Sequence, residues 1–217
     1  MRPSSGLMRL LGASVSGLIY PLAFSPFDFF WLAPLSIGVL FLTWRSASPR
    51  QAMLCGFLFG MASVLVGVSW IYVSLHTFGN MPPVLAATSV VVFGAIMALY
   101  PMLVGGLLGC ISRRSDAWQW LVFAPVLWVL GEWLRGVLLS GFPWLFLGYS
   151  QVDTPLAALF PLVGTLGVSL WMTFAVGAVL TLIFDSRTRR LVPAAVFASL
   201  LLLAVLARLP SFVAPQG

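Results

Sequence analysis

The sequence predicts an all-α integral membrane protein, a bundle of about seven transmembrane helices. Hydrophobic residues make up 61% of the 217 residues and charged residues only 7%, whereas an ordinary soluble protein has about 25% charged residues. The apolar residues also form long runs separated by short polar segments. So few charged side chains cannot cover the surface of a water-soluble chain of this length, which excludes soluble and disordered classes.

Seven apolar segments are candidate membrane helices. They cover residues 7–24, 29–44, 52–75, 84–111, 117–139, 156–184 and 191–209. A helix needs about 20 residues at a rise of 1.5 Å to cross a hydrocarbon core of about 30 Å. Segment 29–44 is short and contains Pro34, so its boundaries are the least defined. Long runs without alternating polarity favour helices over barrel strands, and the prediction is one transmembrane domain over residues 1–217.

The ends of two segments carry further signals. Arg2 and Arg9 before the first apolar run are also typical of a cleavable signal peptide. Because six more segments follow, retention as the first helix is the favoured interpretation. Thr154 followed by Pro155 predicts an N-cap and a first-turn proline at the start of the sixth helix.

The arginines predict the orientation in the membrane. With a cytoplasmic N-terminus, the inner segments hold Arg2, Arg9, Arg45, Arg50, Arg113, Arg114, Arg187, Arg189 and Arg190. The outer segments hold only Arg135 and Arg208. This asymmetry follows the positive-inside rule, and seven crossings then place the C-terminus on the outer face. It also accounts for the net charge of +6, so no nucleic-acid partner is expected.

The residues alone predict no catalytic centre, cofactor or metal site. Cys55 and His76 lie on one predicted helix about 30 Å apart, and Cys110 is at the inner end of the next helix. A constellation of His76 with Asp153 and one of Ser74, Ser140 and Ser150 is conceivable on the outer face, but no local motif supports it. The His and Cys spacings match no metal-binding pattern.

The outer connections combine aromatic residues with glycine and proline. Aromatic residues at headgroup depth occur in any membrane protein, and a lipid or substrate surface is the other interpretation. Glu132 and Arg135 stand three residues apart on one helix face and predict a structural ion pair. The alternative is an anchor for a phospholipid headgroup or for an adjoining domain.

Three strings from these connections carry a family resemblance. They are LAFSPFDFFWLAPLS (Leu22–Ser36), VSWIYVSLHTFGNMP (Val68–Pro82) and EWLRGVLLSGFPWLFLGYSQ (Glu132–Gln151). They resemble the N-terminal membrane domain of apolipoprotein N-acyltransferase, with similarity from about Gly17 to Leu209. The resemblance implies a multi-pass enzyme of the bacterial inner membrane with a periplasmic C-terminus and a cytoplasmic N-terminus.

The implied activity is transfer of an acyl chain from a phospholipid donor to the N-terminal diacylglyceryl-cysteine of an apolipoprotein. In the family, a Cys, a Glu and a Lys do this in a nitrilase-like domain that follows the seventh helix. This sequence stops at Gly217 and contains no Lys, so no catalytic residue is carried over. The expectation is a fragment or truncated form, inactive alone, with a separately encoded nitrilase-like domain as a further partner.

By the same resemblance, one set of residues borders the lipid or substrate cleft: Trp70, Tyr72, His76, Phe142, Pro143, Trp144 and Tyr149. Glu132 and Arg135 would brace the end of their helix. A small channel or transporter, or a non-catalytic membrane scaffold, is the alternative function. Transport is disfavoured because the predicted spans hold almost no ionisable residues at mid-depth.

Overall fold

A computed structural model describes residues 3–111, 116–184 and 198–199, and every regular element in these ranges is helical. The α-helices are α1 (Pro3–Ile19), α2 (Leu32–Trp44), α3 (Pro49–Gly67), α4 (Trp70–Val73), α5 (Pro83–Ile111), α6 (Asp116–Trp118), α7 (Ala124–Val137) and α8 (Phe160–Phe184). Short 3₁₀ or π-helical turns join them: η1 (Tyr20–Ala23), η2 (Ser74–Phe78), η3 (Gln119–Phe123), η4 (Leu138–Ser140), η5 (Leu147–Gln151) and η6 (Pro155–Leu159).

Five helical stretches in the described ranges are long and apolar enough to cross a bilayer. They are Gly6–Ala23, Pro49–Gly67, Pro83–Ile111, Gln119–Ser140 and Pro155–Phe184. The chain is therefore a helical, multi-pass membrane protein, as the composition predicts. Of segment 191–209, the seventh predicted span, the structure describes only residues 198–199, and the number of seven spans stays a prediction.

The second predicted span differs from the others. Helix α2 begins at Leu32 and has 13 residues, which is about 20 Å of helix and too short to cross the hydrocarbon core alone. Neighbouring helices cover most of it: the buried side chains include Ile37, Leu40, Phe41 and Trp44. A helix that is apolar all round is stable in such a protein environment, so α2 needs no full-length lipid contact.

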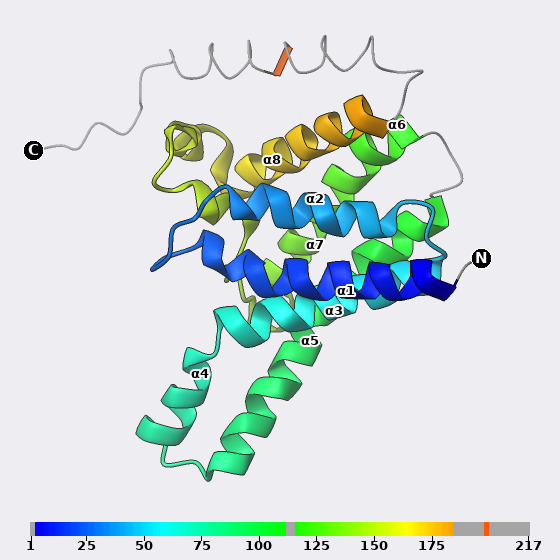
Figure 1. Ribbon diagram of the computed structural model, residues 1–217. Coiled ribbons are helices and arrows are strands. Elements are labelled where there is room, and N and C mark those ends of the chain that lie inside the picture. Colours follow the sequence, from blue (N-terminus) through cyan, green and yellow to red (C-terminus); the bar gives the residue numbers. More distant parts are fainter. Residues whose placement is uncertain (1–2, 112–115, 185–197, 200–217) are drawn as a thin grey trace, which may run out of the picture.

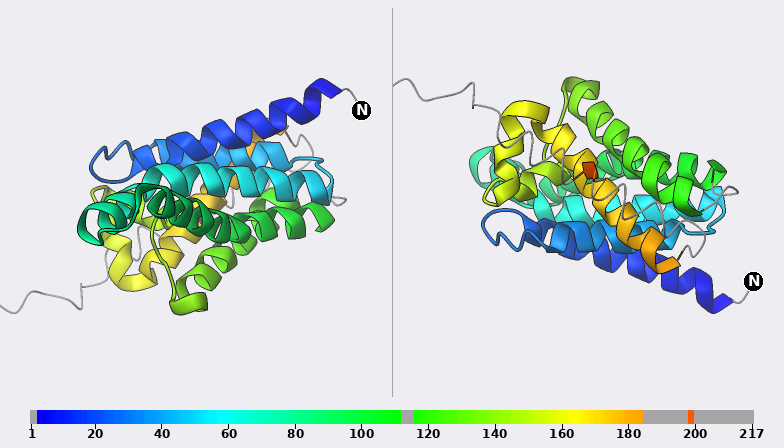
Figure 2. Two further views of the ribbon diagram at one scale, coloured as in Figure 1. Left: turned by 90° about the horizontal axis from the view of Figure 1, so that it is seen from below. Right: turned by 90° about the horizontal axis from the view of Figure 1, so that it is seen from above.

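The six long helices form a closed ring of contacts in the order α1, α2, α8, α7, α5 and α3, with α3 returning to α1. Figure 1 and the two views of Figure 2 show α1 and α2 side by side, while α4 and the N-terminal half of α5 extend away from the other helices. Aromatic rings from three helices fill the centre of the ring. Phe41 stacks on Trp120 at 6.1 Å and meets the edge of Trp128 at 6.4 Å between ring centroids.

Glycines bring α3 and α5 into close contact. A methyl group at Gly56 would collide with the backbone carbonyl of Pro101, and one at Gly60 would lie 2.8 Å from the Cα of Ala98. In lipid, the hydrophobic effect does not drive helices together, because the lipid tails are also apolar. Small residues let the helix backbones come into contact, and the van der Waals packing gained there stabilises the pair. Among the described helices, α3 and α5 share the most extensive interface, and its close approach depends on glycine at these positions.

The predicted continuous helix 52–75 is wrong at its C-terminal end. Helix α3 ends at Gly67, and the chain then turns into α4 and the π-helical η2. Gly67 has no room for a side chain, because a Cβ there would lie 2.6 Å from Cδ1 of Leu145 and 3.2 Å from Cβ of Pro21. The break therefore occurs where two distant loops press against the helix, which a local hydrophobicity pattern does not reveal.

Arginines gather at one end of the bundle. The Arg9 guanidinium donates hydrogen bonds to the carbonyls of Thr43 and Arg45, both 2.6 Å long. The guanidinium of Arg45 lies 4.7 Å from the ring centroid of Phe184, at the end of α8. The start of α1 and the ends of α2 and α8 therefore meet at this end, as alternating membrane crossings require.

The start of α3 allows a direct test of the fold. The Ser48 hydroxyl accepts a hydrogen bond from the Gln51 amide, and the Gln51 side chain accepts one from the Ser48 amide. We expect Ser48→Ala to lower the free energy of unfolding by about 1 kcal/mol, because it removes this capping box. Thermal unfolding in detergent micelles measures the change, and Ser48→Thr, which keeps the hydroxyl, should unfold close to the wild type.

Candidate functional site: an aromatic groove at one end of the bundle

A groove of about 660 Å³ opens at the end of the bundle opposite the arginines. Three segments that are distant in the sequence line it: residues 21–28 after α1, residues 66–70 at the end of α3, and residues 143–153 after α7. Most of its lining is apolar, with Phe24, Trp70, Trp144 and Tyr149 supplying aromatic surface. Its charged lining residues are two aspartates, Asp28 and Asp153.

The third wall is the segment Gly141–Gln151, which we call the outer loop; it ends in the 3₁₀ turn η5. The backbone has a positive φ at Ser140 (74°), directly before the outer loop, and again within it at Gly141 (75°) and Leu145 (57°). Such backbone is costly for a residue with a side chain. The outer loop therefore depends on surrounding contacts that fix its shape.

Ring contacts fix the first half of the outer loop. Phe142 meets the edge of the Phe93 ring on α5, with 4.9 Å between centroids. Trp144 lies 5.5 Å from Trp70, across the groove wall formed by the end of α3 and the start of α4. Aromatic contacts of this kind contribute about 0.5–1.5 kcal/mol beyond the buried area, so they order the loop against two helices.

Hydrogen bonds fix the second half of the outer loop. The carbonyl of Leu145 accepts bonds from the Tyr20 hydroxyl at 3.2 Å and the Arg135 guanidinium at 3.3 Å. The Leu147 amide donates to a carboxyl oxygen of Glu132 at 2.7 Å. The next amide, that of Gly148, donates to the Ser169 hydroxyl at 2.8 Å. Side chains from η1, α7 and α8 thus hold backbone groups at positions 145, 147 and 148.

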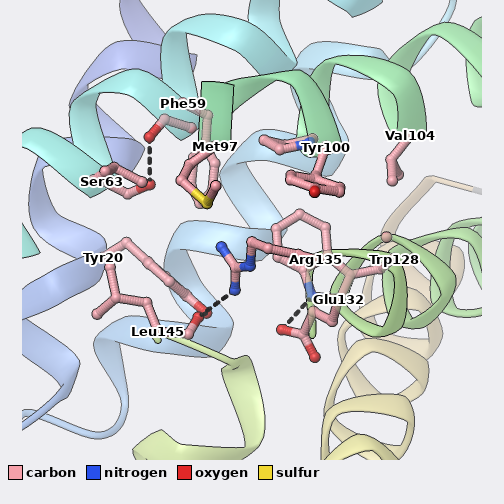
Figure 3. A pocket seen from close by; sticks show the side chains of 14 residues that line it. Tyr20, Phe59, Ser63, Met97, Tyr100, Val104, Trp128, Glu132, Arg135 and Leu145 are labelled. Carbon is pink, nitrogen blue, oxygen red and sulfur yellow. Dashed lines mark hydrogen bonds between the residues drawn. The ribbon is translucent and has the colours of Figure 1, made fainter. Parts of the chain in front are cut away.

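These polar groups surround a small cavity inside the bundle, of about 30 Å³. Figure 3 shows Tyr20 and Arg135 converging on Leu145, with Glu132 bonded to Trp128 on the same helix. One carboxyl oxygen of Glu132 and the Nε of Arg135 are buried without a protein partner. Buried polar atoms of this kind are usually satisfied by water, and the cavity is large enough for one or two molecules. Leu145 lines both the cavity and the groove.

The structure brings together four of the seven residues expected at the lipid cleft. Trp70, Pro143, Trp144 and Tyr149 all line the groove. The other three lie elsewhere: Phe142 packs inward against α5, while Tyr72 and His76 contact each other with 5.4 Å between ring centroids. The Nδ1 of His76 lies 2.9 Å from the carbonyl oxygen of Met81.

Glu132 and Arg135 lie on one helix as their spacing predicts, and each forms a hydrogen bond with the outer loop; Glu132 also accepts one from the Trp128 indole. The Arg135 guanidinium also lies over the Phe146 ring, 5.0 Å from its centroid. Their contacts are thus with the loop that forms the groove wall. Their role as an ion pair stays a prediction.

Neither cysteine is among the described residues that line the groove. Cys55 is buried in α3, and Cys110 lies near the end of α5 that packs on the start of α3, away from the groove. Ser150 donates its hydroxyl proton to the Leu147 carbonyl at 2.7 Å, so it is committed to the loop. Within the described ranges, no three His, Cys, Asp or Glu residues lie close enough to hold a metal ion.

Sequence reasoning did not single out Tyr20 or Ser169 as residues that support the site. Each is a buried polar residue in an otherwise apolar segment, and this was the available signal. Their bonding partners are 125 and 21 residues away in the chain, so no local motif could identify them. Thr154, in contrast, caps η6 as predicted, accepting from the Leu156 amide at 3.2 Å.

An all-helical bundle with an aromatic groove at one end defines the class of this chain as a multi-pass membrane protein with an apolar groove. Residues 16–178 match the family model of the apolipoprotein N-acyltransferase N-terminal domain. The chain belongs to this family.

Relatives support the assignment. The chain is 40% identical over 184 residues to the apolipoprotein N-acyltransferase of Vibrio cholerae, covering 85% of this chain and 36% of the relative. The enzymes of that name from Methylococcus capsulatus and Nitrosomonas europaea are each 42% identical, over 185 and 168 residues. These alignments cover 85% and 76% of this chain, and 37% and 34% of the two relatives. The chain thus spans little more than a third of the length of these relatives.

Proposed function

We propose that this chain forms the membrane platform of an apolipoprotein N-acyltransferase, and that the groove admits an acyl chain of the phospholipid donor. The observation that carries the proposal is the groove itself, an apolar surface built by three segments and walled by Trp70 and Trp144. Transfer of a methylene group into an apolar site gains about 0.8 kcal/mol. A lipid chain that leaves the bilayer is thus kept in contact with apolar surface.

The arginine distribution supports a periplasmic position for the groove. Arg9 and Arg45 meet at the opposite end of the bundle, and the positive-inside rule places that end in the cytoplasm. With seven crossings, the chain beyond residue 209 would then emerge on the groove side. We propose the bacterial inner membrane as the location, with the diacylglyceryl-modified apolipoprotein approaching from the periplasm.

We propose that the platform binds lipid while a nitrilase-like domain, from the rest of the protein or from a separate polypeptide, carries the catalytic Cys, Glu and Lys. We expect the purified chain to transfer no acyl group from phospholipid to a diacylglyceryl lipopeptide, measured by the mass of the lipopeptide. The full-length Vibrio cholerae relative, assayed in parallel, is the positive control. An acyl thioester on Cys55 or Cys110 would contradict the proposal.

Lipid binding in the groove is tested by fluorine NMR of the chain labelled with 5-fluorotryptophan in detergent micelles. Replacement of single tryptophans by Phe assigns the resonances. We expect phosphatidylethanolamine, added to the micelles, to shift the Trp70 and Trp144 resonances until they saturate. Trp118 is the matched control, because it is an exposed tryptophan that does not line the groove.

A shift of equal size at Trp118 would indicate nonspecific transfer between lipid and detergent. An absence of any shift at Trp144 would indicate that no acyl chain enters the groove. Either result contradicts the proposed function. A shift confined to Trp70 and Trp144 supports it, and also disfavours a scaffold without a lipid site.

A further inference from the structure

Beneath the groove, the outer loop is tied to the helices by a small set of buried side chains. We infer that Glu132 is a positioning residue, which orders the outer loop and thereby the wall of the groove. The Glu132 side chain is only 4% exposed. One of its carboxyl oxygens accepts two hydrogen bonds, from the Leu147 amide at 2.7 Å and from the Trp128 indole at 3.1 Å.

These two bonds connect the outer loop to the aromatic cluster at the centre of the bundle. Trp128 meets the edges of the rings of Phe41 and Phe59 in the central aromatic cluster, at centroid distances of 6.4 Å and 6.0 Å. The Glu132 carboxyl thus has the core on one side and the loop backbone on the other. Buried from solvent, such bonds have little competition from water, so the carboxyl can define the position of Leu147.

The backbone at Leu145, two residues before Leu147, is strained and also needs contacts that hold it in place. Leu145 has a left-handed φ of 57°, which persists only when surrounding contacts determine it. Tyr20 and Arg135 hold its carbonyl, and its side chain fits against Gly67. Bonds at positions 145 and 147 therefore fix the chain on both sides of Phe146.

The consequence for the groove rests on the proposed function, whereas the order of the loop does not. Trp144 directly precedes Leu145, and its ring contact with Trp70 forms part of the groove wall. If position 147 is released, the left-handed turn at 145 loses its support and Trp144 can leave Trp70. The groove would then lose the shape that an acyl chain requires.

Amide hydrogen exchange, followed by mass spectrometry on the full chain in lipid nanodiscs, tests this role directly. We expect Glu132→Leu to raise exchange at least tenfold in peptides covering 141–151, because the Leu147 amide loses its acceptor. Glu132→Gln keeps a carbonyl oxygen in the same place and should leave the exchange near that of the wild type. Peptides from α3 and α5 serve as internal controls and should not change.

Two milder variants keep the test informative if Glu132→Leu does not fold. Tyr20→Phe removes one of the two donors to the Leu145 carbonyl, and Ser169→Ala removes the acceptor of the Gly148 amide. Each should raise exchange about two- to fivefold, in peptides 141–151 only. Unchanged exchange in both, or an equal rise in α3 and α5, would overturn the inference, since the residues would then have no role or only a general structural one.

The fluorine NMR titration separates this inference from the proposed function. Faster loop exchange in Glu132→Leu supports the positioning role whether or not the wild type binds lipid. If the wild type shows saturable lipid shifts that Glu132→Leu retains with normal loop exchange, the proposed function stands and the positioning role is overturned. Weaker lipid binding together with faster loop exchange, and recovery of both in Glu132→Gln, supports both.

Discussion

Filling the groove with Ser69→Trp is expected to weaken lipid binding at least tenfold, which corresponds to about 1.4 kcal/mol or more. Ser69 lies on the groove wall at the end of α3, is exposed, and donates its hydroxyl proton to the Val66 carbonyl. Because this side chain is exposed and lines the groove, we expect an indole there to occupy the groove without disturbing the bundle. The measurement is the phosphatidylethanolamine titration followed at the Trp144 resonance.

The matched control is Thr88→Trp. Thr88 is also exposed, its hydroxyl also bonds to a carbonyl of its own helix, and it lies on α5 away from the groove. It should leave the titration unchanged and should unfold at the temperature of the wild type. If Ser69→Trp binds lipid as the wild type does, the acyl chain enters elsewhere and the groove is not the lipid site.

The second large effect is expected at the contact between α3 and α5. Gly56→Leu places a side chain against the Pro101 backbone, where neither helix can yield without separation. We expect a loss of about 1–3 kcal/mol or more of stability, the range measured for overpacked cores. Cys55 is buried beside this glycine, so its reaction with a maleimide dye during heating, in a Cys110→Ala background, reports when the interface opens.

Gly6→Leu is the control for this prediction. No atom lies within 4 Å of a Cβ added at Gly6, and leucine favours helix more than glycine does. This variant should unfold at or slightly above the temperature of the parent. Equal stability of Gly56→Leu and the parent would show that α3 and α5 can separate at little cost, and that close backbone packing is not what holds them.

Much of the groove could be anticipated from residue types. Aromatic residues mixed with glycine and proline in the outer connections indicated either an ordinary aromatic belt or a lipid or substrate surface. The family resemblance implied Trp70, Pro143, Trp144 and Tyr149 as lining residues, and all four line the groove. Tyr72, His76 and Phe142 were expected with them and do not line it. Helix α3 ends at Gly67, and Tyr72 and His76 lie beyond the turn that follows, on α4 and η2. Similarity of sequence motifs alone does not reveal that turn.

The sequence by itself determined the class of the protein, the apolar segments and the end of the bundle at which arginines gather. These properties depend on composition and on the energy of charges in lipid, which are local quantities. Only the tertiary structure decided that α2 is a short buried helix, and that Tyr20, Glu132 and Ser169 hold the outer loop. Those contacts join distant segments, because a buried backbone group takes whichever polar side chain the packing brings to it.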